Sequence, residues 1–181
     1  MKRSVSMLAM ALLVAVPIAA GSAYAAKKLK VPMSLISVDG VGKSVGTITV
    51  SESKDGVTFA TDLKDLPPGE HGFHMHEKNS CAPGEKDGKM MAGGSAGAHF
   101  DPENTKAHKG PGGGGHKGDL PKIEVSEKGT AKAKLAVAGL KLDDVAGKTL
   151  VIHAGGDNYS DTPKPHGGGG DRMACGVVPA K

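Results

Sequence analysis

The histidines of this chain have spacings that could bind metal ions. His74 and His76 flank Met75 in a short stretch that is typical of a strand. Side chains two residues apart on a strand point to the same face, so two imidazoles could bind one ion while Phe73 and Met75 face the core. A His-x-His pair is weak support by itself, because most such pairs are surface residues.

A second set of candidate ligands lies in and just after residues 79–117, a stretch without regular periodicity. Its members are His99, His108, His116 and Asp119. Three imidazoles and one carboxylate make the closed tetrahedral set that structural Zn²⁺ prefers. Metal binding would offset the entropy lost when so glycine-rich a loop becomes ordered. The alternative is a solvated loop that happens to contain histidines.

His153 is a further candidate ligand, because it directly follows the apolar run 149–152. It is therefore expected at the end of a strand, where a rigid element would hold it. With His74 and His76 it could form a nitrogen-rich tetragonal site, which suits Cu(II). Taken alone, His153 could equally be a hydrogen-bonded structural histidine.

Short strands must position these side chains, because no segment after the N-terminus shows a helical stripe. Two alternating runs, 45–53 and 57–63, flank the turn Lys54-Asp55-Gly56 and predict a hairpin. Further strands are expected at 31–38, 72–77, 123–126, 130–137, 148–153 and 175–178, with long loops at 79–117 and 154–170. The pattern predicts an all-β fold, a Greek-key β-sandwich or flattened barrel of about eight antiparallel strands with two long functional loops.

The N-terminus has the features of a cleaved signal peptide. Lys2 and Arg3 precede an apolar run at 7–20, and Ala23 and Ala25 have the small side chains that a signal peptidase requires. The run is shorter than the ~20 residues of a membrane-spanning helix, so a stable membrane anchor is the weaker alternative. We expect a signal peptide at 1–25 and one mature domain at 26–181.

Charge and cysteine content narrow the function further. The net charge is +4, and Lys2 and Arg3 would leave with the signal peptide. The remaining lysines are dispersed and no aromatic residues interleave with them, which argues against nucleic-acid binding but allows attraction of a small anion. Cys81 and Cys175 are the two cysteines, and a single pair in an exported chain usually forms a disulfide. Two free buried thiols are the alternative.

Six motifs together resemble the copper/zinc superoxide dismutase family, from about Val31 to Val178. They are Gly72-Phe73-His74-Met75-His76-Glu77, Gly97-Ala98-His99-Phe100-Asp101-Pro102, His108-Lys109-Gly110-Pro111, Gly115-His116-Lys117-Gly118-Asp119-Leu120, Val151-Ile152-His153 and Gly170-Asp171-Arg172-Met173-Ala174-Cys175-Gly176-Val177. Each motif is modest support, and all six in this order are highly specific. Residues 153–161 look like the bacterial branch in particular.

The resemblance implies two metal sites that share one imidazole. It implies copper on His74, His76, His99 and His153, and zinc on His99, His108, His116 and Asp119. The ring of His99 would be deprotonated between the two cations, which is reasonable because metal charge favours the deprotonated form of a ligand.

Three other features are also carried over from the family by motif. Asp157 matches the carboxylate that links one copper ligand, here His74, to one zinc ligand, here His108. Arg172 matches the arginine that attracts the anionic substrate beside the copper. The two cysteines match the intrasubunit disulfide of the family.

The resemblance implies an enzyme that dismutates superoxide to molecular oxygen and hydrogen peroxide in the periplasm, where it protects the cell envelope. Copper would change oxidation state, zinc would not, and His99 would take up and donate a proton. Arg172 would supply a fixed positive charge near the open copper position. Long-range steering of the anion could come from three lysines: Lys86, Lys89 and Lys164.

Two other functions remain as alternatives, and several residues have no role in the proposed sites. A non-enzymatic periplasmic copper/zinc-binding protein would need the histidines but neither Arg172 nor a bridging imidazole. A secreted β-sandwich with only a structural zinc would leave His74, His76 and His153 unexplained. A homodimer is possible. We expect His71 to be structural, His166 to be solvent-exposed, and Met90 and Met91 to pack in their loop, with a soft copper(I) entry site as the alternative for the methionines.

Overall fold

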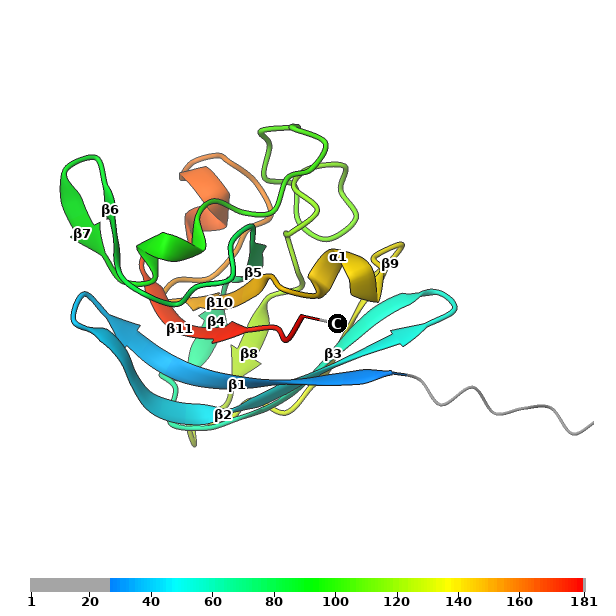
Figure 1. Ribbon diagram of the computed structural model, residues 1–181, viewed down its shortest axis with the longest axis horizontal. Coiled ribbons are helices and arrows are strands. Elements are labelled where there is room, and N and C mark those ends of the chain that lie inside the picture. Colours follow the sequence, from blue (N-terminus) through cyan, green and yellow to red (C-terminus); the bar gives the residue numbers. More distant parts are fainter. Residues whose placement is uncertain (1–26, 181) are drawn as a thin grey trace, which may run out of the picture.

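One curled antiparallel sheet of seven strands forms the scaffold. A computed structural model describes residues 27–180, so the expected signal peptide at 1–25 lies outside the described residues. The strand order across the sheet is β5-β10-β11-β1-β2-β3-β9. Their bounds are β1 Lys28–Ser37, β2 Gly40–Ser53, β3 Gly56–Leu63, β5 Phe73–His76, β9 Lys134–Ala138, β10 Thr149–His153 and β11 Arg172–Val177. The predicted all-β architecture is confirmed, with the two long loops gathered on one side of the sheet (Figure 1).

Shorter elements complete the fold. A second sheet pairs β4 Gly69–His71 with β8 Ile123–Val125, and the hairpin of β6 Gly84–Lys86 and β7 Lys89–Met91 projects from the first long loop. The one-turn helix α1 spans Leu142–Val145, and 3₁₀ turns span Gly94–Ala96 and Pro165–Gly168. Within the described part of the chain, no helix has the length and apolar character needed to cross a membrane.

The β6–β7 hairpin corrects the expectation that 79–117 lacks regular structure. Its turn residues, Asp87 and Gly88, have φ values of 54° and 75°, which suit the tight turn of a two-residue hairpin. Each strand has only three residues, so alternation is too short to be visible in the sequence. The single turn of α1 was missed for the same reason, because four residues cannot show a helical stripe.

Alternation along the strands builds the core. On β2, Ile48 and Val50 are fully buried, and Val50 is the cross-strand partner of the equally buried Phe59 on β3. Phe59 meets Phe73 of β5 edge to face, with ring centroids 5.7 Å apart. This geometry is favourable for aromatic pairs and fixes β5 against the opposite wall of the barrel.

β5 carries His74 and His76 and forms one edge of the main sheet. Its inner edge pairs with β10, and its outer edge is covered by the first long loop. Met75 N–H donates to the Gly118 carbonyl and Phe100 N–H donates to the Met75 carbonyl, both at 2.8 Å. A Cβ at Gly118 would collide with the Met75 carbonyl, so only glycine allows this close approach.

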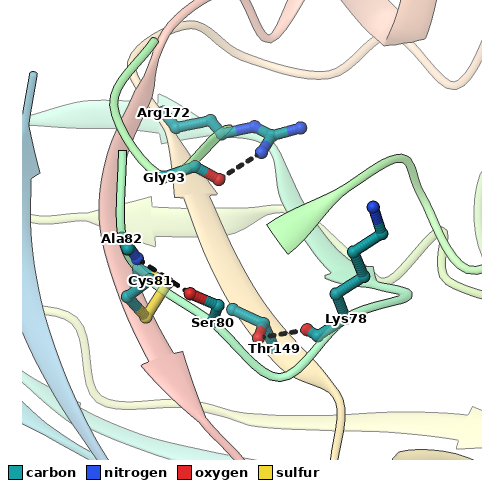
Figure 2. The surroundings of a disulfide bond; sticks show 8 residues. Lys78, Ser80, Cys81, Ala82, Gly93, Thr149 and Arg172 are labelled. Atoms are coloured by element: carbon teal, nitrogen blue, oxygen red, sulfur yellow. Dashed lines mark hydrogen bonds between the residues drawn. A yellow bond between two sulfur atoms is a disulfide. The ribbon is translucent and has the colours of Figure 1, made fainter. Parts of the chain in front are cut away.

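A disulfide between Cys81 and Cys175 ties the first long loop to β11. This confirms the expected pairing. Cys175 is buried against Ala96 and Val151. Figure 2 shows the bridge close to the bond from Arg172 to the Gly93 carbonyl. The disulfide thus anchors the backbone that surrounds the Arg172 side chain.

We expect the double variant Cys81→Ala/Cys175→Ala to be strongly destabilised in the metal-free state. The bridge joins residues 94 positions apart. In the chain-entropy description, a closed loop of this length contributes about 4–5 kcal/mol to the free energy of unfolding. Urea unfolding of metal-free protein measures the loss without the added stabilisation of bound ligands. Ser80→Ala is the control, and an unchanged midpoint for the double variant would contradict the prediction.

Candidate metal centre

Four buried histidines converge beside the first loop. Their ligand atoms lie within 4.8 Å of one another, and the four are His74, His76, His99 and His153. His74 and His76 come from β5 and His153 from the end of β10. The loop brings His99 beside His76 through an isolated antiparallel bridge. Residues far apart in the sequence therefore meet because the sheet edge and the loop pair through their backbones.

Three of these imidazoles are oriented by acceptors on their outer side. His76 Nδ1 lies 2.9 Å from the Gly97 carbonyl, and His153 Nδ1 lies 3.1 Å from the Gly170 carbonyl. His74 Nε2 lies 2.8 Å from a carboxylate oxygen of Asp157. Since carbonyl and carboxylate oxygens only accept, these nitrogens carry the protons, and the opposite nitrogens keep their lone pairs.

The opposite nitrogens are the ones that fit a metal ion. Among the described residues, the buried side-chain atoms without a hydrogen-bond partner are His74 Nδ1, His76 Nε2, His108 Nδ1 and His153 Nε2. An unpaired buried polar atom costs free energy, so four in one cluster require an explanation. Coordination to a metal ion supplies one, because an imidazole that donates on one side is a good ligand on the other.

Burial keeps these rings neutral. It lowers the pKa of His74 and holds the pKa values of His76 and His153 well below the usual range. Burial is also the main cause that lowers the pKa of His99 to about 3, against the opposing hydrogen bond with Asp119. Neutral imidazole is the form that binds metal ions.

A second convergence centres on one oxygen atom of Asp119. Asp119 Oδ1 lies 3.1 Å from His99 Nδ1, 3.0 Å from His108 Nδ1 and 3.2 Å from His116 Nδ1. The contact with His108 is a short ion-pair contact and not a hydrogen bond, so His108 Nδ1 remains among the unpartnered atoms. Three imidazole nitrogens and one carboxylate oxygen that face one another are a chemically suitable donor set for Zn²⁺.

Asp119 and Asp157 also control the charge of His108. Burial opposes ionisation of both carboxyl groups, but the close contacts with the histidines outweigh it and lower the pKa of Asp119 and of Asp157. Burial would likewise lower the pKa of His108, whereas its two carboxylate partners raise it to about 9. A bound cation would take over the role of the proton that His108 shares with these carboxylates.

The histidine groups differ in one respect from the set expected for zinc. When residues are grouped by ligand atoms that lie within 4.8 Å of one another, one group contains His74, His99, His108 and Asp119. His116 falls in a different group, with His99 and His166. His74 lies near His108, with ring centroids 5.2 Å apart, because both donate to Asp157. The place of His116 in a zinc site therefore stays a prediction, supported by its contact with Asp119.

Asp157 links the two groups as expected from its motif. Its two oxygens lie 2.8 Å from His74 Nε2 and 2.8 Å from His108 Nε2, and it is buried. The Tyr159 N–H donates to it at 2.7 Å. A Cβ at Gly167 would overlap the Asp157 carboxylate, and the φ of 72° at Gly167 is itself a conformation that favours glycine. The second long loop thus closes tightly over Asp157.

Arg172 lines a cavity of about 490 Å³ together with three of the four converging histidines, His76, His99 and His153. Its guanidinium donates to the carbonyls of Gly93 and Gly97, and the Gly97 carbonyl also accepts the bond from His76. Burial lowers the pKa of Arg172 from a value so high that the group keeps its charge. Lys78 and Lys86 also line the cavity. Of the three lysines expected to steer the anion, Lys86 lines this cavity, whereas Lys89 and Lys164 do not. Lys78 was not among those expected.

The remaining histidines and methionines have distinct positions. His71 is buried and lies 2.9 Å from both the Pro67 and the His153 carbonyls, as a structural histidine should. His166 is exposed as expected, but its ring faces His99 at 5.0 Å between centroids. Met90 is 57% exposed, so the prediction that it packs within its loop is wrong.

Sequence reasoning also missed the backbone acceptors that orient the rings. The carbonyls of Gly97 and Gly170 hold His76 and His153. No residue type marks a carbonyl as functional. The glycines that flank the histidine motifs were the sequence signal that could have indicated these backbone acceptors.

Known proteins match this chain over most of its length. Residues 44–178 match the family described as copper/zinc superoxide dismutase (SODC). The Cu-Zn superoxide dismutase of Escherichia coli K12 is 51% identical over 167 residues, which cover 92% of this chain and 95% of that protein. That of Brucella abortus biovar 1 is 50% identical over 140 residues, 77% of this chain and 81% of that protein.

Solved structures agree with this match. The Cu/Zn superoxide dismutase from Brucella abortus superposes with a TM-score of 0.82 at 47% identity, covering 84% of this chain and 99% of that one. The solution structure of the monomeric copper, zinc superoxide dismutase from Salmonella enterica gives 0.75 at 51% identity, with the same coverage. The shared barrel, the convergent histidines and the extent of the match lead to one conclusion: this chain belongs to the copper/zinc superoxide dismutase family.

Proposed function

We propose that this chain is a superoxide dismutase that binds copper and zinc and converts superoxide to molecular oxygen and hydrogen peroxide. The observation that carries the proposal is the set of buried, unpartnered imidazole nitrogens beside the half-buried Arg172. Bound copper supplies one-electron redox chemistry, and bound zinc supplies a fixed positive charge.

The proposed copper ligands are His74, His76, His99 and His153, and the proposed zinc ligands are His99, His108, His116 and Asp119. His99 is the shared residue in this assignment. Its Nδ1 lies 3.1 Å from Asp119, and its Nε2 is on the opposite side of the ring. One planar ring with two nitrogens can in this way serve both sites.

The residues around the cavity have separable tasks. Arg172 holds a small anion by charge, and its two carbonyl partners fix the guanidinium so that little reorganisation accompanies binding. His99 Nε2 is the atom from which a proton can pass to the reduced anion. His76 and His153 keep their orientation through backbone carbonyls.

The alternative is a non-enzymatic copper/zinc-binding protein. Such a protein needs ligands that can release an ion, but it does not need a guanidinium fixed at the mouth of the site. The position of Arg172 in the same cavity as His76, His99 and His153 favours the enzyme.

We also propose that the protein acts in the periplasm as a mature chain of residues 26–181. The basic and apolar N-terminal pattern supports export, and the disulfide fits an oxidising compartment. The intact mass of protein recovered from a periplasmic fraction should correspond to a chain that begins at Ala26. Sedimentation velocity of that protein then distinguishes a monomer from the possible homodimer.

The proposed activity is tested by metal analysis and superoxide decay on the same purified mature chain. Two different metals per chain together with fast decay support the enzyme. Two bound metals without decay support the non-enzymatic alternative. One metal without decay supports a purely structural zinc site.

We expect Arg172→Ala to slow superoxide decay by about tenfold or more and to weaken its dependence on ionic strength, because a fixed charge near the reacting anion is lost. Arg172 contacts carbonyls and no proposed ligand atom, so copper and zinc content should be unchanged. Stopped-flow decay at several salt concentrations measures both effects. Lys54→Ala, a charge removed at an exposed turn, is the control. Equal rates for Arg172→Ala and the wild type would exclude the role.

We expect Asp157→Asn to weaken metal binding by about 10- to 100-fold, the usual cost of losing a partner of a metal-bound histidine. The carboxylate accepts from both His74 and His108, whereas an amide would turn an NH₂ donor toward one of them. Competition with a chelator measures the affinities. Asp55→Asn, at an exposed turn, is the matched control. Affinities that match the wild type would show that Asp157 does not orient the ligands.

A further inference from the structure

His166 is a histidine that neither proposed ligand set uses, although it faces both. It lines the same cavity as His76, His99 and His153. Its ring centroid lies 5.0 Å from that of His99 and 6.0 Å from that of His116. One ligand atom from each of His99, His116 and His166 lies within 4.8 Å of the others. Three imidazoles at this spacing can bind one transition metal ion.

The backbone fixes His166 in this position. His166 has φ 53° and ψ 43°, the left-handed region that residues other than glycine seldom adopt. Its N–H donates to Asp161 Oδ1 at 3.0 Å, and Asp161 Oδ2 accepts the N–H of His108 at 2.8 Å. One carboxylate therefore holds the exposed histidine and the buried candidate zinc ligand together.

The three histidines form a gradient of exposure. His166 is exposed, His116 is partly buried and His99 is buried. Deeper still, His108 and Asp119 are buried beside the nitrogens of His99 and His116. An ion arriving from solvent would therefore meet His166 before it could reach Asp119.

We propose that His166, His99 and His116 form an entry site that captures a divalent transition metal ion in the metal-free protein and passes it to the proposed zinc site. The ion keeps its bonds to His99 and His116, while the His166 nitrogen is exchanged for an Asp119 oxygen and the His108 nitrogen. No electron is transferred. This inference rests on the proposed zinc ligands, but it concerns the route of loading and not the reaction.

The rate of Co²⁺ uptake by metal-free protein tests the entry site, because Co²⁺ bound in a zinc site absorbs visible light. The variant is His166→Asn, since asparagine tolerates the left-handed conformation but has no imidazole. We expect uptake to slow by about tenfold, the lower range for loss of one supporting group at a metal site. The final spectrum and the number of Co²⁺ ions per chain should equal those of the wild type.

Thr162→Ala, a change at an exposed neutral residue of the same loop, is the control and should take up Co²⁺ at the wild-type rate. An unchanged rate for His166→Asn would overturn the proposal. So would an altered final spectrum or a lost equivalent of Co²⁺, because His166 would then be a permanent ligand. Superoxide decay by the fully loaded wild-type protein is measured separately, so failure of the proposed activity is distinguished from failure of the entry site.

Discussion

The backbone pairing between the outer edge of β5 and the first long loop is the constraint on which the metal centre depends. Hydrogen bonds through Met75, Phe100 and Gly118 set the register of the loop. That register places His99 opposite His76 and Asp119 opposite His74. Side chains on a strand edge point in fixed directions. Pairing with that edge therefore fixes the positions of the loop side chains, although the loop is not itself a strand. A long irregular segment can thus carry ligands that must lie within a few ångströms of one another.

The same arrangement concentrates polar groups in the interior, where they are costly unless paired. The Asp157 carboxylate holds His74 and His108 by their outer nitrogens and leaves the inner ones without hydrogen-bond partners. A bound metal ion would supply the partner that these nitrogens lack. Metal binding and folding are coupled in such a centre, because the ligand set exists only in the folded protein.

Much of this could be predicted from the sequence, since alternation and spacing are local signals. The β2–β3 hairpin and the inward faces of Phe73 and Met75 follow from period-two patterns. The disulfide follows from a single cysteine pair together with the expectation of export. The β6–β7 hairpin was too short to leave a pattern. The approach of His166 to His99 depends on a left-handed residue and a carboxylate elsewhere in its loop, which residue types do not reveal.

The Gly97 carbonyl has a consequence for how this protein can change. One oxygen atom receives hydrogen bonds from His76 and from Arg172. Residue 97 has φ 79° and ψ −155°, and a Cβ there would collide with the Glu77 side chain, so no other amino acid fits easily. The proposed anion-binding guanidinium and a proposed copper ligand are therefore held by the same carbonyl oxygen. A shift of the backbone at residue 97 would therefore move the side chains of His76 and Arg172 together.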